Sequence, residues 1–191
     1  MKRIGILGDI GSGKSYFSRL FGHPRFDADA EVKKIYKNSR KVYLKIKKEF
    51  PKKISSFPVK KLDLSKIILE DKNNIKKINK IVHKEVNKKL VHFLNKNKKK
   101  NFVVLDIPLL IENKINKRGD ILIFIDAKKK DITKHLLKRG YFNEHLLRFL
   151  KKFQLPLERK KRISDFVIKN YFKRNNFQKD IKTIKKKIKN A

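Results

Sequence analysis

Residues 8–15 read Gly-Asp-Ile-Gly-Ser-Gly-Lys-Ser and fit the phosphate-binding pattern G-x-x-x-x-G-K-[ST]. An apolar stretch over residues 3–7 precedes the motif and a helical pattern over residues 14–21 follows it, which is the strand, loop and helix order that the motif needs. Glycines let backbone N–H groups turn toward a phosphate, and the helix dipole adds positive potential there. Lys14 is expected to reach the β- and γ-phosphates, and the Ser15 hydroxyl is expected to help hold Mg²⁺. The residues expected to bind ATP at this loop are Gly8, Gly11, Ser12, Gly13, Lys14, Ser15 and Tyr16.

Two carboxylates follow predicted strands and are candidates for the chemistry of such a site. Asp106 ends the continuous apolar run of residues 102–106, where a strand-end carboxylate can lie near Mg²⁺ or be an ordinary strand-to-loop residue. Asp29 comes just after the short predicted strand of residues 25–28. It suits either a proton acceptor facing an alcohol or the N-cap of a helix that starts near Glu31.

Length and composition exclude several classes of protein. A chain of 191 residues suits one domain with inserted subdomains. Without cysteine, the chain cannot use disulfides, thiolate metal sites or a cysteine nucleophile. No apolar run approaches the roughly 18 residues of a membrane span, and the first core strand starts at the N-terminus. We therefore expect no membrane association and a cytoplasmic protein.

The net charge of +36 suggests a nucleic-acid-binding protein at first sight. Most of the 54 basic residues are lysines, however, and they are spread over nearly all predicted helices. Proteins that read nucleic acids use arginine forks and clustered aromatic side chains. We interpret the charge as a solvated cationic surface that attracts polyanions non-specifically, with no specific nucleic-acid partner.

Apolar patterning predicts an α/β fold in which a parallel sheet is flanked by helices, the P-loop NTPase or kinase fold. The predicted strands cover residues 2–8, 25–28, 102–106, 121–126 and 166–168. The predicted helices cover residues 14–21, several segments within 30–98, most of 128–163, and a closing helix with Ile181, Ile184 and Ile188 on one face. The chain lacks the Asn-Lys-x-Asp sequence of GTPases and is short for a helicase, so a small P-loop kinase fits best.

Several short segments, in their order and spacing, resemble the dephospho-CoA kinases. The first is the P-loop, and the second is the Asp-Ala-Asp sequence of residues 27–29. The matching segments are residues 5–15, 27–29, 81–83, 106–112, 154–160 and 164–170. Together they span nearly the whole chain.

The resemblance implies transfer of the γ-phosphoryl group of ATP to the ribose 3′-hydroxyl of dephospho-CoA, the last step of coenzyme A synthesis. ATP and dephospho-CoA are then the small-molecule partners, with Mg²⁺ as the cofactor. It also implies three parts within one domain. These are a core of about residues 1–30, 101–127 and 164–191, a helical substrate subdomain of about 31–100, and a lid of about 135–160.

The resemblance assigns further roles residue by residue. Asp29 matches the proposed base, Arg139 a lid arginine that reaches the transferring phosphoryl group, and Lys160 a second lid cation. The expected substrate contacts are Asp29, His83, Asp106, Pro108, Leu109 and Leu110. Asn170 is expected near the adenine of ATP.

Some positions depart from the family pattern. Leu7 and Tyr16 stand where threonine is usual, Asp9 where glycine is usual, Lys84 where proline is common, and His135 and Leu150 where arginines occur. Asp9 places a carboxylate in a phosphate cradle, which is unfavourable unless it points away or meets a lysine. Two alternatives stay open: a kinase of the same fold that acts on another nucleoside or small alcohol, and a non-catalytic P-loop protein that binds nucleic acid.

Overall fold

The computed structural model describes residues 1–71, 73–138, 144–173 and 176–190. The chain divides into two compact units, one of Met1–Asp27 with Asn97–Ala191 and one of Ala28–Lys96. The first unit contains every strand of the described residues, and the second is helical.

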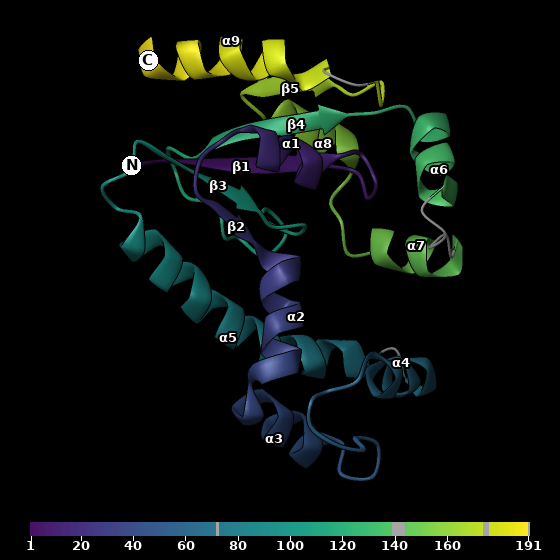
Figure 1. Cartoon of the computed structure of the whole chain (residues 1–191). Coiled ribbons are helices and arrows are strands. Elements are labelled where there is room, and N and C mark those ends of the chain that lie inside the picture. Colours follow the sequence, from purple (N-terminus) through teal and green to yellow (C-terminus); the bar gives the residue numbers. More distant parts are fainter. Residues whose placement is uncertain (72, 139–143, 174–175, 191) are drawn as a thin grey trace. The chain divides into compact units, whose positions relative to one another are not determined.

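The first unit is built on a five-stranded parallel sheet with strand order β2-β3-β1-β4-β5 (Figure 1). The strands are β1 (Lys2–Gly8), β2 (Arg25–Asp27), β3 (Phe102–Asp106), β4 (Ile121–Asp126) and β5 (Phe166–Lys169). The inner strands β1, β3 and β4 are almost continuously apolar, as expected of strands buried on both faces. The fold class predicted from the sequence is confirmed.

Helices cover both faces of this sheet. The helices of the first unit are α1 (Lys14–Leu20), α6 (Lys129–Lys138), α7 (Glu144–Lys151), α8 (Leu157–Arg162) and α9 (Asn176–Asn190). Phe17 and Phe21 from α1 and a stripe of apolar residues from α9 pack with Ile4, Ile123 and their neighbours in one buried cluster. On β1, Gly5 leaves room for Leu110, because a Cβ there would lie 2.4 Å from Cδ2 of that leucine.

The second unit consists of α2 (Ala28–Asn38), α3 (Arg40–Glu49), α4 (Lys61–Glu70) and α5 (Asn74–Lys96). Helix α5 packs against the other three helices of the unit. Its buried residues Ile78, Val82, Val86 and Leu90 recur every fourth position, which places them on one face. Ser39 caps α3 by accepting a hydrogen bond from the backbone N–H of Val42 at 3.3 Å.

One boundary differs from the sequence-based expectation. Strand β2 ends at Asp27 and α2 begins at Ala28, so Asp29 lies in the first turn of a helix rather than in a loop before one. Glu31 lies in the same turn, and two carboxylates there favour an early start because they interact with the positive end of the helix dipole. In the parts of the chain described above, no helix is both long and apolar enough to cross a bilayer.

Candidate nucleotide site

The phosphate-binding loop has the conformation that its glycines permit. Gly8, Gly11 and Gly13 have φ angles of 145°, 81° and 95°, which side chains disfavour. Space is equally restrictive, because a Cβ at Gly8 would lie 2.7 Å from the carbonyl oxygen of Ile125. A Cβ at Gly13 would lie 2.5 Å from Nδ2 of Asn170. The motif therefore forms a tight loop that only this pattern of glycines allows.

The Lys14 side chain folds back over this loop. Its Nζ donates to the backbone carbonyl oxygens of Gly8 at 3.2 Å and Asp9 at 2.6 Å. The hydroxyl of Ser12 is buried and has no hydrogen-bond partner among the described residues. Buried hydroxyls are normally paired, so an unpaired one in a phosphate-binding loop is a ready donor for a phosphate oxygen.

Asn170 directly follows β5 and binds the backbone of the phosphate-binding loop. Its Nδ2 donates to the carbonyl oxygen of Ser12 at 2.9 Å, and its Oδ1 accepts from the backbone N–H of Phe172 at 2.8 Å. The side chain is buried. The expectation from the family resemblance that Asn170 lies near the adenine of ATP stays a prediction; in the structure its amide binds the backbone of the loop and of the following segment.

Asp106 lies at the carboxyl end of β3 and is bound within the first unit. Its Oδ2 accepts from Ser18 Oγ and forms an ion pair with Arg25, both at 3.0 Å. Arg25 also pairs with Asp27 at 2.9 Å. The Ser18 hydroxyl has one proton and lies 3.0 Å from both Asp106 Oδ2 and the carbonyl oxygen of Ser15, so it can donate to either one and places Asp106 beside the start of α1.

The Ser15 hydroxyl and the Asp106 carboxylate suit an Mg²⁺ ion that is bound mainly through phosphates. Ser15 is exposed in the first turn of α1. Within the described ranges there is no cluster of three carboxylate or histidine side chains that could form an all-protein metal cage. Mg²⁺ keeps several waters and takes few protein ligands at nucleotide sites, so a hydroxyl and a nearby carboxylate suffice.

Asp9 meets a lysine. Its Oδ2 pairs with Nζ of Lys151, the last residue of α7, at 2.8 Å. Its Oδ1 accepts from the N–H of Ile10 at 2.7 Å. The unfavourable carboxylate in the loop is therefore neutralised by a cation from a segment that is remote in the sequence.

A second ion pair ties α8 to the segment after β3. Nζ of Lys160, which is 1% exposed, lies 2.7 Å from Oε1 of Glu112. The same oxygen accepts from the backbone N–H of Leu155 at 2.9 Å. Glu112 and Lys160 both lie in segments that resemble the family, and the pairing gives Lys160 a buried structural position.

Lys160→Met should lower the free energy of unfolding by about 3 kcal/mol, because it leaves the Glu112 carboxylate buried without its counter-ion. Denaturant unfolding measures the loss. Lys161→Met is the matched control, since Lys161 pairs with Asp126 in a partly exposed position. The double variant Glu112→Gln, Lys160→Met should recover part of the loss. An equal loss in Lys160→Met and Lys161→Met would contradict the role of the buried pair.

The remaining predicted residues fall into four groups. Pro108 and Leu109 are half-buried and accessible to a substrate, whereas Leu110 is fully buried against Gly5. Asp29 and His83 belong to the second unit, and partial desolvation of the His83 ring lowers its pKa. Arg139 lies outside the described residues. Tyr16 is exposed on α1 with its ring centroid 6.0 Å from that of Phe177.

Sequence reasoning missed three residues that support the site: Ser18, Arg25 and Lys151. Ser18 stands three positions after Ser15 and shares its side of α1, which is a weak signal for a second hydroxyl near the loop. Arg25 is opposite Val104 in the sheet register, close to the end of β3. Lys151 had no distinguishing signal in a chain so rich in lysine.

The fold and the loop together define a class of protein. A parallel sheet of order β2-β3-β1-β4-β5, with a glycine-rich phosphate-binding loop between β1 and α1, is that of a P-loop kinase. The family model for dephospho-CoA kinases matches residues 2–175. A dephospho-CoA kinase from Bartonella quintana is 35% identical over 173 residues, which cover 88% of each chain. The chain belongs to the dephospho-CoA kinase family.

Solved structures agree with the fold. A crystal structure of a Thermus thermophilus protein matches with a TM-score of 0.80 at 24% identity over 97% of both chains. A dephospho-CoA kinase from Campylobacter jejuni matches with a TM-score of 0.67 at 19% identity over 98% of this chain and 97% of that one. At these identities the likeness concerns the fold alone.

Proposed function

We propose that the protein phosphorylates the ribose 3′-hydroxyl of dephospho-CoA with ATP, giving coenzyme A and ADP. The observation that carries the proposal is the intact phosphate-binding loop, with its three positive-φ glycines and Lys14 folded over it, in a chain of this family. In the reaction, the 3′-oxygen forms a bond to the γ-phosphorus. The bond between that phosphorus and the β,γ-bridging oxygen breaks, and ADP leaves.

The residues of the loop bind and orient the triphosphate. Lys14 and the loop N–H groups neutralise the β- and γ-phosphates, and the unpaired Ser12 hydroxyl adds a donor. Bound Mg²⁺ would offset the charge that develops on the phosphate oxygens. Ser15 would hold the ion directly, and Asp106, already paired with Arg25, would hold one of its waters.

Asp29 accepts the proton of the 3′-hydroxyl. It follows β2 by two residues along the chain, and β2 ends at the same carboxyl edge of the sheet as β1 and its loop. Ligands of open α/β sheets bind at that edge, which supports a base there.

Dephospho-CoA binds through several parts of the chain. Pro108 and Leu109 supply half-buried apolar contacts after β3. The helical unit Ala28–Lys96, which contains His83, serves as the substrate subdomain. Residues 135–160 act as the lid, to which Arg139 contributes a bidentate cation for the transferring group.

Incubation with Mg-ATP and dephospho-CoA, followed by chromatographic detection of coenzyme A, tests the proposal. Formation of coenzyme A and ADP in equal amounts supports it. ADP formation with another nucleoside or small alcohol, and none with dephospho-CoA, would assign a different acceptor. Salt-sensitive RNA binding without any kinase activity would favour the non-catalytic alternative.

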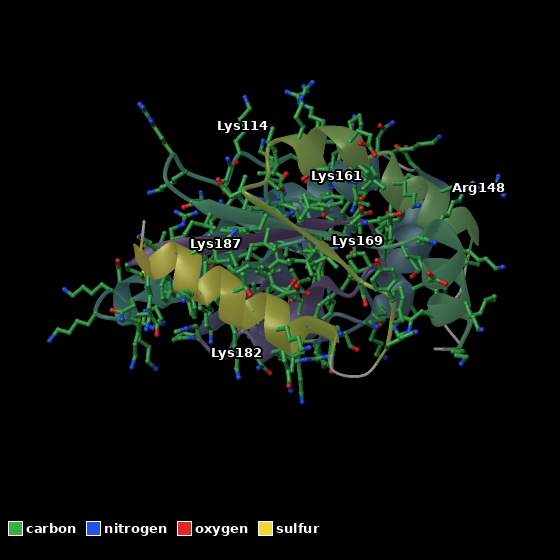
Figure 2. The ribbon with its side chains drawn as sticks, turned by 90° about the horizontal axis from the view of Figure 1, so that it is seen from above. Lys114, Arg148, Lys161, Lys169, Lys182 and Lys187 are labelled. Atoms are coloured by element: carbon green, nitrogen blue, oxygen red, sulfur yellow. The ribbon has the colours of Figure 1, made fainter. Side chains whose placement is uncertain are left out.

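The high positive charge supports no specific polyanion partner. Figure 2 shows that the labelled basic side chains of the first unit extend from several different elements. They are Lys114, Arg148, Lys161, Lys169, Lys182 and Lys187. A cationic surface of this kind raises the local concentration of ATP and dephospho-CoA, which are both anionic. We infer a cytoplasmic location, where ATP is supplied.

A further inference from the structure

Asp9 joins two lysines to the phosphate-binding loop. Its backbone carbonyl oxygen accepts from Nζ of Lys14 at 2.6 Å, and its carboxylate accepts from Nζ of Lys151 at 2.8 Å. The second carboxylate oxygen accepts from the N–H of Ile10 at 2.7 Å. One loop residue therefore organises a backbone amide and two ammonium groups.

These contacts change what the loop offers to an anion. The N–H of Ile10 is already bonded to Asp9, so it is not a free donor for a phosphate. A lysine ammonium carries three donors, of which the contact with Asp9 uses one. The side chain of Lys151 is 36% exposed, whereas that of Asp9 is 9% exposed, so the accessible group of the pair is the cation.

We propose that Lys151 is a phosphate-binding residue of the ATP site and that Asp9 is the positioning residue that fixes it there. The inference rests on the proposed use of the loop for ATP. It explains why a carboxylate is tolerated in the cradle, because Asp9 binds a cation from α7 whose remaining donors can serve the triphosphate.

Two explanations of Asp9 predict opposite changes in ATP affinity for the variant Asp9→Asn. Removing a carboxylate near bound phosphates weakens a repulsion, so Asp9→Asn by itself should tighten ATP binding. If Asp9 instead positions Lys151, the same substitution releases that lysine and weakens ATP binding. The sign of the Asp9→Asn effect therefore separates a bystander from a positioning residue.

A double-mutant cycle with ATP binding as the readout tests this inference. Titration calorimetry with Mg-ATP and no acceptor gives Kd for wild type, Asp9→Asn, Lys151→Met and the double variant. Lys151→Met should raise Kd about tenfold, the effect of losing one charge-assisted hydrogen bond. Asp9→Asn should raise Kd several-fold in the wild-type background. In the Lys151→Met background it should lower Kd, because only the repulsion then remains.

Three further variants and one ligand complete the experiment. Lys151→Arg should restore Kd to within about threefold of wild type, since it keeps the charge. Lys152→Met removes the neighbouring exposed lysine and should leave Kd unchanged. Adenosine should bind wild type and Lys151→Met equally, because it has no phosphate. Asp9→Ser replaces Asp9→Asn if circular dichroism shows that the asparagine variant is unfolded.

Two results would overturn the inference. One is a Kd for ATP that Lys151→Met leaves unchanged or lowers, since the lysine would then be idle or would obstruct the site. The other is tighter ATP binding by Asp9→Asn with Lys151 present. The titrations use no acceptor. If the enzyme fails to form coenzyme A but the variants change the Kd for ATP as expected, only the proposed acceptor is disproved.

Discussion

Lys14→Ala is expected to lower the rate of coenzyme A formation by about 10³-fold, since a preorganised cation that faces developing phosphate charge contributes about this much to such reactions. In the structure the carbonyl oxygens of Gly8 and Asp9 hold the Lys14 ammonium at the phosphate-binding loop. The substitution also removes hydrogen bonds from both carbonyl groups.

Steady-state kinetics at saturating Mg-ATP measures the effect, and thermal unfolding shows whether the loop still folds. Lys130→Ala is the matched control, because it removes one exposed lysine of α6 and changes the net charge equally. Turnover of Lys14→Ala within a few-fold of wild type would overturn the assignment of the loop. A folded variant that binds ATP weakly and turns over slowly supports it.

The parts of the protein that follow local rules were predictable from the sequence. The buried strands show as apolar runs, and the loop shows as a motif with glycines where the backbone has positive φ. The helical stripe of α5 follows from its four-residue spacing. Each of these signals lies within a few neighbouring residues.

The contacts that complete the site were not predictable, because they join residues far apart in the sequence. Asp9 and Lys151 are 142 positions apart, and nothing distinguishes Lys151 from its many lysine neighbours. Asn170 was matched to the family, but its bond to the Ser12 carbonyl depends on where β5 ends beside the loop. Leu110 was expected to contact substrate, but it is fully buried and packs where Gly5 has no side chain.

Asp29→Asn is expected to lower turnover by about 10³-fold while ATP binding stays within about twofold of wild type, because a general base contributes 10² to 10⁴ to proton-transfer steps and does not hold the nucleotide. Asparagine keeps the size of the side chain and its capacity to accept hydrogen bonds but cannot take up the proton. Rates at saturating ATP and dephospho-CoA, with ATP affinity from calorimetry, test both parts of the expectation.

The alternative is that Asp29 only stabilises the start of α2, and Glu31→Gln separates the two. Both carboxylates lie in the first turn of that helix, so each contributes to its stability through the dipole, by about 0.5 kcal/mol. A helix-stabilising role predicts that both variants lower the melting temperature similarly and leave turnover nearly intact. A base predicts a large loss of turnover for Asp29→Asn alone. If Glu31→Gln lost as much activity, the proton acceptor could not be assigned to Asp29, because the effect would then follow the shared charge of the helix terminus.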